Sequence, residues 1–176
     1  MNRKLLTAEG YKKLKDELEY LHRTLRPEIT EIVSWAASLG DRSENADYQY
    51  NKRKLREIDR RIRHLTKLFE VAEEVPYNPV QEGKVYFGAW VELENDEGEN
   101  LRFRIVGDEE VYGRNDYISL RSPMAKACLG KTVDEDVLVC TPAGDAHWYV
   151  VKIEYNLAAE PANKYPKGGG PSGAHS

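Results

Sequence analysis

The segment Ser38-Leu39-Gly40-Asp41-Arg42-Ser43 joins two stretches whose apolar residues recur with helical spacing. Before it, the intervals are 4, 3, 4, 4, 3 and 4 residues, through Leu14, Leu18, Leu21, Leu25, Ile29, Ile32 and Ala36. After it, the intervals are 3, 4, 3, 4 and 3 residues, through Leu55, Ile58, Ile62, Leu65, Phe69 and Ala72. Each pattern gives a helix one narrow apolar seam with polar flanks, so we expect the two helices to pack as an antiparallel hairpin.

The ends of the two helices have recognisable signals. Thr7 is suited to cap the first helix, with Glu9 in its first turn, and Gly40 can supply the left-handed residue that ends it. Pro27 falls inside the first helical pattern, where it removes a backbone hydrogen bond, so we expect a kink. A helix of about 30 residues extends about 45 Å, so the loop is expected to lie far from any globular body.

The second half of the chain has strand-like patterns. The sequence Val75-Pro76-Tyr77-Asn78-Pro79 breaks the helix, and apolar stretches bounded by turn residues follow, with one short helix expected from Pro123. The sequence therefore predicts an α+β fold, a helical hairpin followed by a small, mainly antiparallel sheet domain. The expected divisions are a hairpin over 1–75, a linker over 76–80, a sheet domain over 81–156 and a disordered tail over 157–176.

Composition excludes several classes of protein. No apolar run approaches the roughly 20 residues that span a bilayer, and residues 1–7 lack the apolar stretch of a secretory signal. Only Cys128 and Cys140 are present, which is no disulfide framework and suits a reducing compartment. We therefore expect a cytoplasmic protein that does not associate with membranes.

Charge is distributed unevenly along the chain. The net charge is −4, but residues 1–75 have 16 basic and 14 acidic residues, whereas the remainder has 10 and 16. Residues 52–67 have eight basic residues against Glu57 and Asp59, and five of them recur at intervals of 4, 4, 3 and 4 residues. These five, the basic stripe, are Lys52, Arg56, Arg60, Arg63 and Lys67. A solvated face balanced by the two acids is one interpretation, but the excess of positive charge favours contact with phosphates.

The acids near the hairpin loop allow two interpretations. Asp41-x-x-Glu44 fits a capping box, in which Asp41 caps the second helix and Glu44 reaches back from its third position. Alternatively, the two carboxylates project from the loop and share a Mg²⁺ ion. Mg²⁺ prefers octahedral oxygen ligands, so two carboxylates alone make a weak site, which a second macromolecule would have to complete.

Other sites are weakly indicated. The four histidines are scattered, no Cys or His spacing matches a zinc site, and the chain has no glycine-rich phosphate loop. Arg121-Ser122-Pro123 is typical of a helix start.

Taken together, these segments resemble the Gre transcript-cleavage factors, and the GreB branch in particular. The resemblance covers about residues 1–156. The matching stretches include Leu6-Thr7-Ala8-Glu9-Gly10-Tyr11, Arg26-Pro27-Glu28, Gly40-Asp41-Arg42-Ser43-Glu44-Asn45-Ala46-Asp47-Tyr48, Arg56-Glu57-Ile58-Asp59-Arg60-Arg61, Tyr86-Phe87-Gly88-Ala89-Trp90-Val91, Arg102-Phe103-Arg104-Ile105-Val106-Gly107, Ser122-Pro123-Met124-Ala125 and Thr141-Pro142-Ala143-Gly144.

The resemblance implies a coiled-coil hairpin and an FKBP-like domain without isomerase activity. The globular domain of such factors docks at the rim of the secondary channel of bacterial RNA polymerase, and the hairpin enters the channel. Asp41 and Glu44 match the two acids that complete a Mg²⁺ site in the polymerase; the ion is not expected to bind to the factor alone. The implied polymerase-docking residues are Arg121, Ser122 and Pro123, although an acidic or neutral residue is expected at position 121. The implied contacts to the nascent RNA 3′ end are Lys52, Arg53, Arg56, Arg60, Arg61, Arg63 and Lys67.

By this interpretation the chain is a monomeric activator of cleavage by the polymerase and is not itself an enzyme. One alternative is a regulator with the same fold that blocks the channel without stimulating cleavage; the presence of both Asp41 and Glu44 favours cleavage. A second is a prolyl isomerase or chaperone, in which the hairpin would have no role. A third, a structural coiled-coil protein, leaves the basic stripe unexplained.

Overall fold

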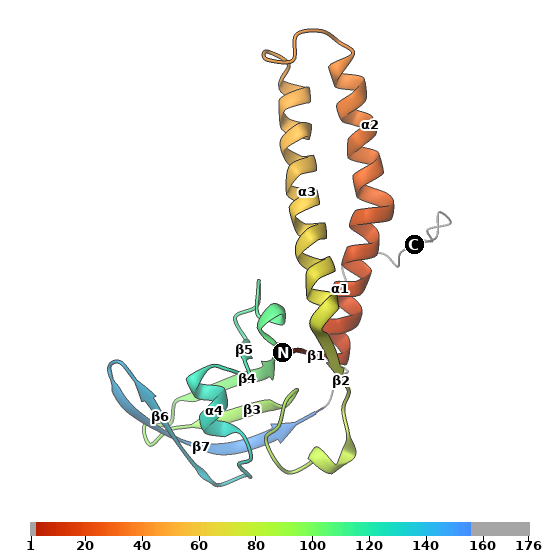
Figure 1. Ribbon diagram of the computed structural model, residues 1–176. Helices are drawn as coiled ribbons and strands as arrows, with labels where there is room; N and C mark the ends of the chain where they lie inside the picture. The colour runs from red at the N-terminus through yellow and green to blue at the C-terminus, as the bar shows by residue number, and fades with distance from the viewer. Residues whose placement is uncertain (1–2, 156–176) are drawn as a thin grey trace. The chain divides into compact units, whose positions relative to one another are not determined.

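The computed structural model describes residues 3–155, which form two compact units. One unit contains residues 12–71, and the other combines residues 3–11 with residues 72–155. The fold is α+β, as predicted, with an N-terminal helical hairpin and a C-terminal sheet domain (Figure 1). Among the described residues, no helix has both the length and the apolar character that crossing a membrane requires.

The hairpin consists of helices that run in opposite directions. Helix α1 (Ala8–Tyr20), a π-helical turn (Leu21–Leu25) and α2 (Arg26–Ala37) lead to the loop, and α3 (Ala46–Val71) returns beside α2 (Figure 1). The predicted apolar seams are confirmed in part: six of their residues are buried, and Val33 and Leu68 are buried as well. The other buried seam residues are Leu14, Leu21, Ile29, Ala36, Ile58 and Leu65. The half-buried seam residues are Leu18, Leu25, Ile32, Leu55, Ile62 and Phe69.

The expected irregularity at Pro27 takes the form of a π-helical turn. The five residues Leu21–Leu25 precede α2, and Pro27 lies in the first turn of α2. The N–H of Arg26 donates to the carbonyl of Leu21, five residues earlier. Because proline has no N–H and its ring crowds the carbonyl four residues before it, a wider turn at this point accommodates Pro27 without ending the rod.

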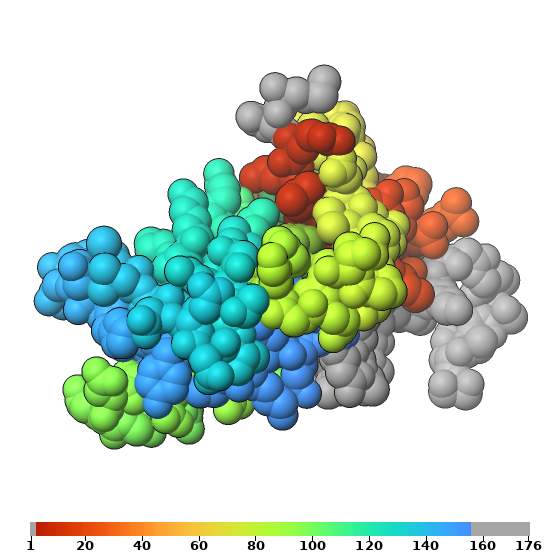
Figure 2. All heavy atoms as spheres, turned by 90° about the horizontal axis from the view of Figure 1, so that it is seen from below, coloured from red at the N-terminus to blue at the C-terminus, as the bar shows by residue number. Residues whose placement is uncertain are grey.

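The sheet domain contains a five-stranded sheet with the order β5-β4-β3-β7-β6. Its strands are β3 (Trp90–Glu94), β4 (Asn100–Val106), β5 (Tyr117–Ser119), β6 (Asp136–Thr141) and β7 (Gly144–Glu154). All neighbours are antiparallel except β4 and β5, which are parallel. Helix α4 (Pro123–Cys128) packs beside β6, as Figure 2 shows in teal and light blue, and its Ala125 and Cys128 are buried in the same core as Val91, Ile105 and Val137.

The first residues of the chain differ from the expected division. Strand β1 (Lys4–Thr7) pairs in parallel with β2 (Ala72–Val75), so residues 3–11 group with the sheet domain and not with the hairpin. Ala72, expected at the end of the second helix, begins β2. Four-residue strands at the two ends of a helical pattern leave no alternation long enough to detect, and their pairing joins segments far apart in sequence. The predicted tail, 157–176, lies outside the described residues.

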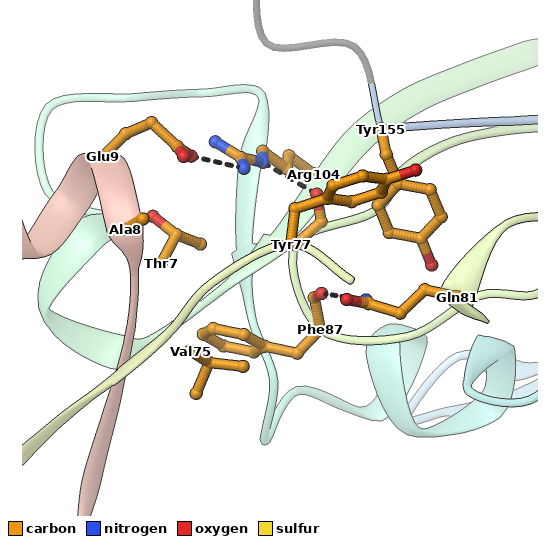
Figure 3. Close-up of a pocket in the computed structure, with 10 residues that line it drawn as sticks. Thr7, Ala8, Glu9, Val75, Tyr77, Gln81, Phe87, Arg104 and Tyr155 are labelled. Atoms are coloured by element: carbon orange, nitrogen blue, oxygen red, sulfur yellow. Dashed lines mark hydrogen bonds and ion pairs between the residues drawn. The ribbon is translucent and has the colours of Figure 1, made fainter. Parts of the chain in front are cut away.

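A buried arginine anchors this N-terminal segment to the sheet domain. Arg104 on β4 is 3% exposed, and its guanidinium pairs with Glu9 at 2.6 Å and donates to the carbonyl of Gly88 at 2.9 Å (Figure 3). Burial lowers the pKa of Arg104, but the hydrogen bonds to Glu9 and Tyr117 outweigh it and the net pKa is raised. Arg104 therefore remains a cation inside the domain, because its charge is paired.

Nearby contacts close the small cavity around this ion pair. Gln81 donates to the carbonyl of Phe87 at 3.1 Å, and the rings of Tyr77 and Tyr155 lie 5.6 Å apart (Figure 3). The cavity volume is only about 10 Å³, enough for about one water molecule, so this cavity holds no substrate.

Candidate functional site at the hairpin tip

The loop between α2 and α3, residues 38–45 (the tip loop), presents two exposed carboxylates. Asp41 accepts hydrogen bonds at one oxygen, Oδ1, from the backbone N–H of Ser43 at 3.0 Å and from its hydroxyl at 2.8 Å. Within residues 3–155, the Glu44 carboxylate has no hydrogen-bond or ion-pair partner. These two side chains (the tip acids) therefore keep oxygens available for an external ligand.

The capping-box interpretation of the tip acids is wrong. Helix α3 begins at Ala46, and its N-cap is Asn45, whose Oδ1 accepts from the N–H of Tyr48 at 3.0 Å. Asp41 instead stabilises a turn within the loop through Ser43. The pattern was misleading because Asn45 is an equally good capping residue and lies directly before the helix.

Gly40 supports the sharp exit from α2. Its φ angle of +126° lies in the region that residues with a Cβ rarely adopt. The helix itself ends earlier, at Ala37, with Ser38 as its C-cap. The prediction that Gly40 ends the first helix is therefore wrong, since its positive φ belongs to the tip loop, two residues beyond the C-cap.

The basic stripe lies on α3, immediately after the tip loop in sequence. Arg56, Arg60, Arg63 and Lys67 are exposed, and Lys52 is half-buried. None of the five forms an ion pair within residues 3–155. Neighbouring Arg53 is also exposed. A helix face with this many unneutralised cations attracts polyanions such as nucleic acid.

Of the two acids that could have balanced the stripe, Glu57 is exposed, and Asp59 is used elsewhere in the hairpin. Asp59 pairs with Arg26 of α2 at 2.6 Å. Arg61, expected among the RNA-binding residues, forms a two-pronged ion pair with Glu17 of α1, with distances of 2.7 and 2.9 Å. Glu17 is 7% exposed, so this ion pair fastens α3 to α1, and the expected RNA contact of Arg61 stays a prediction.

The predicted docking residues lie at the start of α4 in the sheet domain. Ser122 caps this helix by accepting from the N–H of Ala125 at 3.2 Å, and Pro123 is its first residue. Arg121 is exposed, and its guanidinium pairs with Asp108 at 2.6 Å. A hydrogen bond from Ser119, supported by Arg121, lowers the pKa of Asp108. Asp108 therefore partly neutralises Arg121, at the position where the sequence resemblance led us to expect an acidic or neutral residue.

The tip acids fit a magnesium ion only in part. Carboxylate oxygens are the ligands that Mg²⁺ prefers, but the ion takes about six ligands in all. Among residues 3–155, no three acidic, histidine or cysteine side chains are grouped to hold a metal. The loop can thus contribute two carboxylates to a shared ion, with the remaining ligands coming from water and a partner.

Comparisons with known proteins show which family this chain is similar to. Residues 4–73 match the family model for the N-terminal part of transcription elongation factors GreA and GreB, and residues 80–155 match the model for the C-terminal part. Transcription elongation factor GreB of Pseudomonas putida is 63% identical over 155 residues, covering 88% of this chain and 96% of the relative. GreB of Vibrio cholerae is 62% identical over 156 residues, covering 88% and 97%.

Among solved structures, GreA factor homolog 1 of Thermus thermophilus is similar, with 29% identity, a TM-score of 0.41 and coverage of 87% of this chain and 99% of that one. The two family models together span nearly all the described residues. The chain therefore belongs to the GreA/GreB family of transcription elongation factors.

Proposed function

We propose that this elongation factor enters the secondary channel of bacterial RNA polymerase and stimulates cleavage of backtracked RNA 3′ ends. The observation that supports this most directly is a pair of exposed carboxylates, Asp41 and Glu44, on the loop of a long hairpin. Helix α3 alone has 26 residues, which corresponds to about 39 Å. Such a rod can bring the tip acids to an active site deep inside a larger enzyme.

In this proposal the chain supplies groups to an active site that belongs to the polymerase. The tip acids contribute oxygens to a Mg²⁺ ion shared with acidic residues of the polymerase and orient the water that attacks the phosphodiester. When bound, such an ion supplies Lewis-acid chemistry for phosphodiester hydrolysis. The factor alone holds the ion weakly, since two carboxylates satisfy only part of its coordination. The factor acts as a monomer in the cytoplasm and is not an enzyme by itself.

The basic stripe and the start of α4 have supporting roles in the proposal. The exposed cations on α3 contact phosphates of the extruded RNA strand, and such contacts require no particular RNA sequence. The segment Arg121-Ser122-Pro123 at the start of α4 contacts the rim of the channel. Docking and chemistry thus depend on different residues and can be tested separately.

The first test replaces each tip acid in the full chain. We expect Asp41→Asn and Glu44→Gln to lower stimulated cleavage in a backtracked complex by about 10²-fold or more, the usual effect of losing a transition-state contact. Binding to polymerase, measured by competition with labelled parent protein, is expected to remain unchanged. The control is Glu57→Gln, which removes an exposed acid outside the loop. Full cleavage by Asp41→Asn at equal occupancy would rule out the metal role.

The second test concerns the basic stripe. We expect the double change Arg60→Ala and Arg63→Ala to reduce release of long RNA fragments selectively and to leave dinucleotide release within about twofold, because only a long extruded strand reaches these positions. Lys13→Ala with Arg23→Ala removes two exposed charges from the first helical segment and serves as a matched control. Equal losses for long and short fragments would show that the stripe does not contact the extruded strand.

A further inference from the structure

The first turn of α3 holds the tip loop through contacts that do not involve the tip acids. Asn45, the N-cap directly before this turn, and Gln49 on the turn each donate a side-chain amide hydrogen bond to a backbone carbonyl outside α3. Between them, Tyr48 lies under the guanidinium of Arg42, which is 5.5 Å from the ring centroid. The loop backbone is thus tied to a regular helix at two points.

Asn45 links the ends of the two helices. Its Oδ1 accepts from the N–H of Tyr48 at 3.0 Å and caps α3, while its Nδ2 donates to the carbonyl of Ala36 in the last turn of α2 at 2.7 Å. Ala36 is fully buried in the seam, so this carbonyl is a fixed point. Glu44 directly precedes Asn45, and its backbone position is therefore set by this link.

Gln49 fixes the part of the loop between the two acids. Its Nε2 donates to the carbonyl of Arg42 at 2.7 Å, and Arg42 directly follows Asp41. Asp41 is itself held by Ser43 at one oxygen only. The backbone beside each tip acid therefore has one amide anchor, Gln49 near Asp41 and Asn45 next to Glu44.

We propose that Asn45 and Gln49 are positioning residues, which set the separation and direction of the Asp41 and Glu44 carboxylates for a shared Mg²⁺ ion. This inference rests on the function proposed above. Neither amide needs to touch the ion, the water or the RNA. A divalent ion held by two oxygens from one loop needs those oxygens at a fixed separation, and a misplacement of about 1 Å can cost about 10²-fold in rate.

The variants separate positioning from helix formation. Asn45→Ser keeps an N-cap acceptor for Tyr48 but cannot reach Ala36, and Asn45→Asp keeps the cap while replacing the donor by a carboxylate oxygen. Gln49→Ala removes an exposed side chain and only the bond to Arg42. The matched control is Asn51→Ala, since Asn51 Nδ2 also donates to a backbone carbonyl, that of Asp47 at 2.9 Å, but within α3.

The measurement is stimulated cleavage in a backtracked complex at saturating factor, over a Mg²⁺ titration. We expect Asn45→Ser, Asn45→Asp and Gln49→Ala to lower the rate about 10- to 100-fold at low Mg²⁺, to raise the half-saturating Mg²⁺ concentration several-fold and to recover partly at high Mg²⁺. In these three variants, the helix content measured by circular dichroism and the binding measured by competition for polymerase are expected to equal those of the parent. The control Asn51→Ala is expected to equal the parent in every measurement.

The remaining outcomes contradict the proposal. Parent-like rates and Mg²⁺ dependence for Asn45→Ser and Gln49→Ala would overturn it, as would rates that fall in proportion to binding or helix content without a change in Mg²⁺ dependence. An equal loss in Asn51→Ala would do the same. Asp41→Asn, measured alongside, distinguishes failure of the proposed function from failure of the positioning role. If Asp41→Asn stimulates cleavage like the parent, the proposed function fails. If Asp41→Asn loses stimulation while the Asn45 and Gln49 variants keep it, only the positioning role is refuted.

Discussion

Glu110 shows how a single carboxylate connects the N-terminal segment to the sheet domain. One of its oxygens accepts from the backbone N–H groups of Thr7 and Gly107, each at 2.9 Å, and the other accepts from the Thr7 hydroxyl. Burial raises the pKa of Glu110, although the bonds from Thr7 and Gly107 oppose the shift. The carboxyl group of Glu110 therefore binds its proton more tightly in the native state than in the unfolded chain.

This shift predicts how stability depends on pH at this residue. The contribution of the raised pKa is complete below the unfolded value of 4.5 and is lost as pH rises through the native pKa. We expect the Tm of the parent to fall relative to that of Glu110→Gln as pH increases from about 4 to 7, because the variant lacks the group that releases a proton in this range. A constant difference in Tm by scanning calorimetry over that range would contradict the assignment.

At the scale of the elements, the hairpin depends on packing along its two seams. Leu65 is fully buried in the α3 seam, in the last third of the helix. We expect Leu65→Ala to lower the free energy of unfolding by about 2–5 kcal/mol, because it removes apolar contacts and leaves a cavity. Urea denaturation followed by circular dichroism measures this loss.

The adjacent residue supplies the control for the seam. Thr66 is exposed on the same helix, so Thr66→Ala is expected to change stability by less than about 0.5 kcal/mol. Because alanine has the highest helix propensity of all residues, a loss in either variant cannot come from helix propensity. Similar changes in the free energy of unfolding for the two variants would therefore contradict the predicted role of seam packing. The tip variants Asn45→Ser and Gln49→Ala leave both seams intact, which is why their effect is expected on cleavage and not on folding.

At the scale of the whole molecule, the segments before and after the hairpin, β1 and β2, belong to the sheet domain. In this domain the backbone of β1 lies very close to Gly107. A Cβ at Gly107 would overlap the backbone carbonyl of Leu5, yet the φ of Gly107, −74°, suits any residue. The requirement for glycine here is therefore steric. We expect Gly107→Ala to destabilise the sheet domain by about 1–3 kcal/mol, measured by chemical denaturation.

A truncation tests the cause of that loss. In a chain that lacks residues 1–6, the Leu5 carbonyl is gone, so Gly107→Ala is expected to cost almost nothing further. If the substitution is as damaging in the truncated chain as in the full one, the approach of strand β1 (Lys4–Thr7) does not explain the glycine.

The sequence by itself determined the features that depend on local periodicity and residue type. Apolar spacing predicted the hairpin seams, and the same count placed Arg60 and Arg63 on one helix face, which the structure shows to be exposed. The resemblance of the loop to a known family identified Asp41 and Glu44, whose side chains the structure leaves exposed, although their role stays a prediction.

Only the tertiary structure decided which groups are free and which are already paired. Glu17 and Arg61 are 44 residues apart in sequence, and no local pattern distinguishes this arginine from its unpaired neighbours on α3. Local sequence patterns likewise did not predict the parallel pairing of β1 with β2 or the hydrogen bond from Asn45 to Ala36. Helical periodicity specifies which face a side chain occupies, but ion pairs and amide links require two chain segments at hydrogen-bond distance, which folding alone brings about.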